Sequence, residues 1–240
     1  MYRTGLTIET AQSTGEGSSS KMVRRRFGKA YVTDTRVSRS DSSRVGAAAG
    51  RYITIEGEPQ EHVVTMLLQK ALEQMLPREG MILAVGLGNP DVARDSLGPK
   101  TVEHLSCFGR LVAMETDIAA KTGIETARMV RAVAKELKVS CVLAIDALAC
   151  RDPLKIGRTV QISDTGLRPG SGVFAESPAL TKSFVCTPIV AVGVPMVSEL
   201  SGITGNKSHK GFLAAPPNED ELTQQWSQVI AEAVNCITCR

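Results

Sequence analysis

The stretch that decides the fold is Ile82-Leu-Ala-Val-Gly-Leu-Gly-Asn-Pro-Asp-Val-Ala-Arg-Asp-Ser-Leu-Gly-Pro99, in the first half of a 240-residue chain. It opens with the apolar run 82–85, which lies between glycines and is typical of a strand buried on both faces in a parallel sheet. Two glycines and a proline in the next five residues predict a sharp turn after this strand. In open α/β sheets the loops beyond the carboxyl ends of the strands form the ligand crevice. Asp95 therefore lies where chemistry is usually done.

A second carboxylate follows a second apolar run. Residues 139–145 predict another buried strand, which ends directly in Asp146, so we expect Asp95 and Asp146 to face one crevice. When two carboxyl groups approach closely, repulsion and desolvation raise one pKa, which leaves one carboxylate to draw a proton from water and one acid to protonate a leaving group. Amide hydrolysis is such a reaction. The structural alternatives are helix capping by Asp95 and turn hydrogen bonds by Asp146.

Strand and helix signals alternate along the rest of the chain. Further strands are predicted at residues 31–37, 51–56, 111–114, 159–163 and 189–194. Helices are predicted at residues 62–76, 100–105, 124–137 and 219–239. This pattern predicts an α/β layered fold with a central, mainly parallel or mixed sheet flanked by helices.

Composition and charge set the domain organisation. The chain is 42% hydrophobic and 22% charged, as in ordinary globular proteins. We expect residues 1–26 to form a flexible basic N-terminal segment, followed by one α/β domain over residues 27–240. Residues 21–51 carry nine Lys or Arg against two Asp, which we interpret as a solvated basic segment without direct nucleic-acid contact. The sequence has neither a membrane-span signal nor a signal-peptide pattern, so we expect no membrane partner and a cytoplasmic location.

Other motifs carry less information. The Asp-Thr-Gly at residues 164–166 matches a tripeptide of pepsin-like proteases but occurs once, so Asp164 either lines the crevice or forms a turn. The Gly-Leu-Gly at residues 86–88 lacks the third glycine of a dinucleotide fingerprint. The three histidines lie far apart without metal-ligand spacing, so we expect no metal and no cofactor.

Six blocks of sequence resemble, in the same order, the germination protease family of spore-forming bacteria. They are Val85-Gly-Leu-Gly-Asn89, Asp95-Ser-Leu-Gly-Pro99, Thr122-Gly-Ile-Glu-Thr126, Ala144-Ile-Asp-Ala-Leu-Ala149, Gln161-Ile-Ser-Asp-Thr-Gly166 and Pro169-Gly-Ser-Gly-Val173. The resemblance implies an endopeptidase that degrades small acid-soluble spore proteins during germination in the spore core. It also implies a zymogen, a homotetramer and a fold similar to that of hydrogenase maturation endopeptidases.

The resemblance further implies an aspartic-type enzyme whose two carboxylates match Asp95 and Asp146. Near the N-terminus, Arg3-Thr-Gly-Leu-Thr-Ile-Glu-Thr10 is similar to the segment that the family cleaves in itself, which places autoprocessing between Gly5 and Leu6.

Four further residues are candidates for substrate binding or support. Gly88 and Asn89 lie in a loop whose backbone amides are expected to face a developing oxyanion, and Asp164 and Ser171 are expected to form a wall of the groove. Two alternatives of other classes stay open: a metal-dependent, maturation-type peptidase, and a noncatalytic spore protein on the same scaffold.

Overall fold

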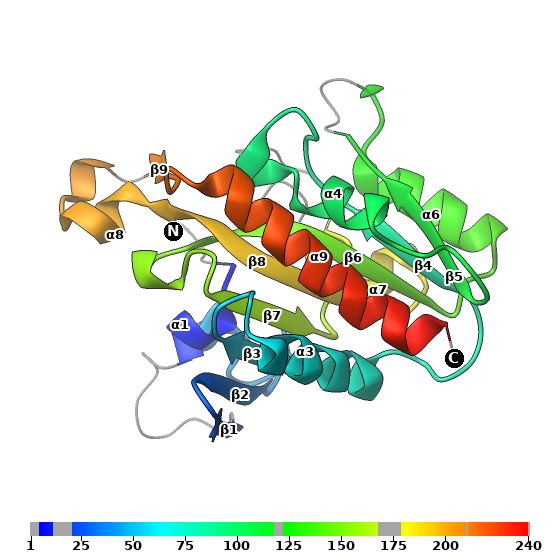
Figure 1. Ribbon diagram of the computed structural model, residues 1–240, viewed down its shortest axis with the longest axis horizontal. Coiled ribbons are helices and arrows are strands. Elements are labelled where there is room, and N and C mark those ends of the chain that lie inside the picture. The colour runs from blue at the N-terminus through cyan, green and yellow to red at the C-terminus, as the bar shows by residue number, and fades with distance from the viewer. Residues whose placement is uncertain (1–4, 12–20, 118–121, 168–178, 210, 240) are drawn as a thin grey trace.

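A nine-stranded mixed sheet forms the centre of the computed structural model, which describes residues 5–11, 21–117, 122–167, 179–209 and 211–239 (Figure 1). Eight of the strands follow one another across the sheet in the order β1-β2-β3-β7-β8-β6-β4-β5, and β9 pairs with β8. The bounds of the first four along the chain are β1 Lys21–Phe27, β2 Ala30–Val37, β3 Gly50–Glu56 and β4 Ile82–Gly86. The others are β5 Leu111–Glu115, β6 Cys141–Cys150, β7 Thr159–Ser163, β8 Ile189–Glu199 and β9 Leu213–Ala214.

The sheet has a parallel half and an antiparallel half. Strands β5, β4, β6 and β8 are parallel, as expected for buried apolar runs, whereas β7, β3, β2 and β1 pair antiparallel beyond β8. The mixed α/β sheet predicted from the sequence is confirmed.

Helices cover both faces of the sheet. On one face lie α3 (His62–Met75), α4 (Leu97–Glu103) and α9 (Glu219–Thr238), the last drawn in red across the sheet in Figure 1. On the other face lie α6 (Thr126–Glu136) and α7 (Lys182–Val185). The short elements are α1 Thr7–Ala11, α2 Ser42–Val45, η2 Ala93–Asp95, η3 Pro153–Lys155, α8 Leu200–Thr204 and η4 Lys207–His209.

Alternation along β6 divides its side chains between the two cores. Leu143 and Ile145 belong to the large core beneath α3 and α9, whereas Val142 and Ala144 belong to the smaller core beneath α6. Successive side chains of a strand point to opposite faces, so Asp146 follows Ala144 onto the smaller-core face of the sheet. Among the described residues no helix has the length and apolar character needed to cross a membrane.

Two strands extend further than their sequence patterns predict. The expected strand that ends before Asp146 continues to Cys150, because β8 supplies a partner as far as Ser198. β8 itself passes through Pro195, which has no N–H to donate; the ladder irregularity between Leu148 and Ala149 lies at this point. Asp146 therefore lies within a long strand and not at its end.

The basic N-terminal region also differs from the prediction of a flexible segment up to residue 26. Lys21–Phe27 is the edge strand β1, whose Arg24 forms an ion pair with Glu56 at 2.9 Å and lies 4.3 Å from the ring centroid of Tyr31. These contacts attach the basic run to β2 and β3.

Replacing Trp226 tests how α9 is attached to the sheet. This indole is fully buried and donates a 2.7 Å hydrogen bond to the Gly157 carbonyl. Trp226→Phe should lower the free energy of unfolding by about 2 kcal/mol or more, because it leaves that carbonyl without its donor and opens a small cavity. Urea unfolding followed by circular dichroism measures the change. Phe212→Leu, at a side chain that is 63% exposed, should shift it by less than about 0.5 kcal/mol.

Candidate active site

Asp95 reaches the carboxyl edge of the sheet because the chain turns tightly after β4. Gly88 has φ +117°, and a Cβ there would lie 1.9 Å from the Asp95 carbonyl oxygen, so only glycine lets the loop fold back against η2. A Cβ on Gly98 would lie 2.6 Å from the Ile145 carbonyl oxygen, so the start of α4 packs directly on β6. The glycines of the 82–99 stretch thus bring Asp95 next to the strand that carries Asp146.

Asp95 is half-buried and hydrogen-bonded at its carboxylate. Burial raises its pKa above the ordinary value, and the charge of Asp117 acts in the same direction. The backbone N–H of Asn89 donates to Asp95 Oδ2 at 2.8 Å and, with Arg94, lowers the pKa. A hydrogen bond to the charged form and a nearby positive charge both favour ionisation, so the Asn89 N–H and the charge of Arg94 oppose the effect of burial on the pKa of Asp95.

Asp146 is 3% exposed and lies one residue beyond the level at which β4 ends, since Gly86 pairs with Ile145. Burial raises its pKa well above the ordinary value, and the negative charge of Asp95 raises it further, whereas a hydrogen bond from the Ala147 backbone lowers it. The two carboxyl groups therefore lie within electrostatic reach of each other. The sequence prediction placed both in one open crevice, but the structure closes the space around Asp146.

Asp95 and Asp146 have unequal environments, which suit them to different roles in proton transfer. Asp146 is the more deeply buried and its pKa is raised the more strongly, whereas Asp95 has a backbone donor and a neighbouring Arg94 that oppose the rise in its pKa. One neutral acid beside one carboxylate is the arrangement that general acid–base chemistry needs.

The other predicted residues have different positions. Gly88 and Asn89 lie beside Asp95, but the Asn89 amide is directed to the Asp95 carboxylate. Asp164 is exposed and accepts a 2.8 Å hydrogen bond from the Arg51 backbone at the end of β7, toward the amino end of β8 and away from the aspartate pair. Ser171 lies outside the described residues.

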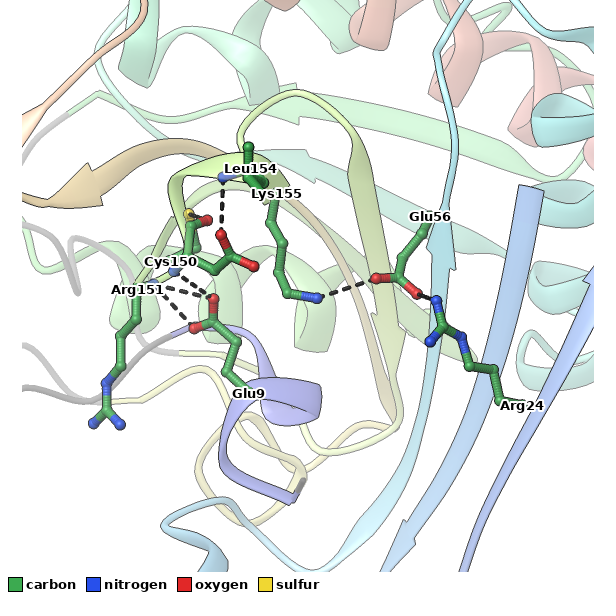
Figure 2. Close-up of polar contacts among 8 residues, drawn as sticks. Glu9, Arg24, Glu56, Cys150, Arg151, Leu154 and Lys155 are labelled. Carbon is green, nitrogen blue, oxygen red and sulfur yellow. Dashed lines mark hydrogen bonds and ion pairs between the residues drawn. The ribbon is translucent and has the colours of Figure 1, made fainter. Parts of the chain in front are cut away.

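Gly5 and Leu6 belong to a segment that is bound along β6. We call residues 5–11 the N-terminal strap. The Gly5 N–H donates to the Ala149 carbonyl at 2.9 Å, and Leu6 is fully buried. The Glu9 carboxylate accepts hydrogen bonds of 3.0 to 3.1 Å from the backbone N–H groups of Arg151 and Asp152 (Figure 2).

Gln161 is a residue that sequence reasoning missed as a functional candidate. Its side chain in β7 bonds the strap at two points, 2.8 Å from the Thr7 nitrogen and 3.0 Å from the Gly5 oxygen. The signal was the alternation of Thr159, Gln161 and Ser163 in a buried strand, which places polar groups on one face. The strap contact itself joins residues more than 150 positions apart and leaves no local pattern.

The described parts of the chain contain no group of three or more His, Cys, Asp or Glu side chains that could together hold a metal ion.

The raised pKa of Asp146 predicts a pH-dependent stability. At pH values between the ordinary aspartate pKa and that of the folded protein, the folded state binds the proton and the unfolded state does not, so the free energy of unfolding falls as pH rises. Asp146→Asn removes this loss. The variant should be the more stable form at pH 7, with an advantage that shrinks by up to about 1.4 kcal/mol per pH unit as the pH is lowered toward 4. Urea unfolding at several pH values measures the difference, and a constant difference would contradict the assignment.

Residues 7–210 match the family described as germination protease. The germination protease of Bacillus cereus is 32% identical over 238 residues, covering 85% of this chain and 65% of that protein. Those of Bacillus subtilis and Bacillus velezensis are 31% and 30% identical over 232 residues, covering 82% of this chain and 63% of each relative.

The chain thus spans slightly less than two thirds of the length of these relatives. Among solved structures, a [NiFe] hydrogenase maturation protease HycI from Thermococcus kodakarensis is similar, with a TM-score of 0.48 and 19% identity over 71% of this chain and 99% of that one. By the extent of the family match, this chain belongs to the germination protease family.

Proposed function

We propose that the protein is an aspartic-type endopeptidase in which Asp95 and Asp146 activate water against a peptide carbonyl. The observation that carries the proposal is the placement of two carboxyl groups, one buried and one half-buried, at the rim where β4 ends, close enough that the charge of Asp95 raises the pKa of Asp146. Membership in the germination protease family supports a peptidase.

The reaction assigns one role to each carboxyl group. Asp95, ionised, takes a proton from water as the water oxygen attacks the peptide carbonyl carbon. Asp146, protonated, gives its proton to the amide nitrogen as the carbon–nitrogen bond breaks. Asp95 then carries the proton and Asp146 the charge, so a proton transfer between them or with solvent restores the starting state.

The supporting residues take roles that follow from their contacts. Gly88 and Asn89 hold the Asp95 carboxylate in place, since the loop closes on η2 and the Asn89 amide donates to it. This replaces the expected oxyanion role for that amide. We assign Asp164 a structural role: it accepts a hydrogen bond from the Arg51 backbone and so holds the end of strand β7 to strand β3. Ser171 remains a predicted wall of the groove.

The proposed biological setting follows the family. We infer small acid-soluble spore proteins as substrates during germination, and the family match supports a spore-protein substrate. A cytoplasmic location in the spore core, a zymogen form and a homotetramer are proposed with it, on the sequence resemblance alone. Cleavage between Gly5 and Leu6 is retained as the proposed autoprocessing step. Because Gly5 is paired with Ala149 and Leu6 is buried, the strap must leave its site before that bond can be cut.

Substituting each aspartate tests the catalytic pair. Asp146→Asn and Asp95→Asn should each lower kcat for hydrolysis of a small acid-soluble spore protein by about 10² to 10⁴-fold, the usual contribution of general acid–base catalysis. Asp41→Asn is the matched control, because Asp41 is also buried but is paired with Arg44 beside α2. Circular dichroism establishes folding, and a well-folded Asp146→Asn enzyme with near-normal kcat would exclude Asp146 from the reaction.

The same assay separates the alternatives. A metal-dependent peptidase would lose activity to a chelator and regain it with added metal. A noncatalytic spore protein would bind the substrate and leave it intact. The proposed enzyme should cleave the substrate with unchanged kcat in the presence of the chelator.

A further inference from the structure

The N-terminal strap is bound as an extended peptide ligand is bound. Gln161 contacts the backbone on both sides of Leu6: Nε2 donates to the Gly5 carbonyl, and Oε1 accepts from the Thr7 N–H. On its other side, Gly5 donates to Ala149 in β6. The side-chain amide of Gln161 thus offers one donor and one acceptor to a passing main chain, as a neighbouring strand does.

The strap also fills an apolar pocket. Leu6 and Ile8 are both fully buried and form a separate small core with Leu148 and Cys150, against which Ile156 packs. Backbone contacts that ignore side-chain identity, combined with a pocket for one apolar side chain, are the usual elements of peptide recognition by an edge or groove.

Sheet register places this site beside the catalytic pair. Gly193 of β8 pairs with Asp146 on one side and with Gln161 on the other, so the three residues form one row across the sheet. Neighbouring strands lie about 4.8 Å apart, which puts Gln161 and Asp146 about 10 Å apart in this row. An extended peptide advances about 3.3 Å per residue, so a chain held by Gln161 reaches Asp146 within about three residues.

Gly193, the residue between Gln161 and Asp146 in this row, has no side chain, and the Leu148 side chain packs over it. A Cβ on Gly193 would lie 2.6 Å from Leu148 Cδ1, and a Cβ on Gly5 would lie 3.0 Å from Leu148 Cβ. Leu148 therefore lies between the strap and the row that contains Asp146. Asp146 is 3% exposed in this arrangement.

We propose that Gln161 is a positioning residue that clasps the main chain of the substrate at the place now occupied by Gly5 and Thr7, so that the N-terminal strap and the substrate compete for one site. The inference rests on the proposed peptidase function. Glu9, bound to the backbone of Arg151 and Asp152, anchors the strap beyond the clasp and sets how easily it is displaced.

Two variants should move the KM in opposite directions. In a chain whose strap is already weakened by Leu6→Ser and Glu9→Gln, Gln161→Leu keeps the approximate size of the side chain but removes both hydrogen bonds to the substrate. The KM for a peptide substrate should then rise about 10-fold with kcat within about threefold, because the clasp binds substrate and transition state alike. Glu9→Gln weakens the anchor of the competing strap, so the KM should fall. Matched controls are Gln60→Leu, whose amide bonds Gln225 on the surface, and Glu58→Gln, whose carboxylate pairs with Arg158.

A binding measurement decides the inference without catalysis. The full chain carrying Leu6→Ser, Glu9→Gln and Asp146→Asn should bind a labelled Gly-Leu-Thr-Ile-Glu-Thr-Ala peptide in fluorescence anisotropy, and addition of Gln161→Leu should weaken that binding at least 10-fold. Unchanged binding in the Gln161→Leu protein, with folding verified by circular dichroism, would overturn the clasp. If the same chain with Asp146 restored binds the peptide through Gln161 but hydrolyses no small acid-soluble spore protein, the proposed function is overturned and the clasp stands.

Discussion

The site depends on a difference in strand length between β4 and β6. β4 stops at Gly86, opposite Ile145, while β6 continues to Cys150 alongside β8. The sheet therefore has a step at its carboxyl edge, and the chain leaving β4 must turn back over that step. Asp95 returns to it in η2, and Asp146 is the first residue of β6 that β4 leaves without a partner on that side.

Glycines allow the chain to turn back over this step, and burial changes the pKa values of the two aspartates that lie there. The close approach of the Gly88 loop to Asp95, and of Gly98 to β6, leaves no room for a side chain at either position. As a result, the carboxyl groups of Asp95 and Asp146 lie near each other at a site with little access to water, where the charge of Asp95 acts on Asp146. Burial and the charge of Asp95 both raise the pKa of Asp146 there.

Much of this could be predicted from the sequence, because the buried strands are continuous apolar runs and the turns contain Gly and Pro. The α/β class, strand β7 at residues 159–163 and the long helices α3 and α9 agree with their patterns. Strand ends could not be predicted, because they are set by partners elsewhere: β6 passes Asp146 since β8 lies beside it. Asp95 and Asp146 could be identified as candidates from local signals. The clasp of Gln161 on Gly5 and Thr7 is a contact between distant segments, for which a single sequence carries no periodic signal.

The edge strand β1 has a consequence for how molecules of this protein meet one another. It is exposed along its whole length and stands at the end of the sheet order, so the backbone groups on its outer side are open to pairing with another chain. Three consecutive arginines, Arg24 to Arg26, occupy its centre. Two such edges approaching each other would bring six guanidinium groups together, and the repulsion discourages uncontrolled strand addition. The basic run thus protects solubility at the margin of the sheet that is most open to aggregation.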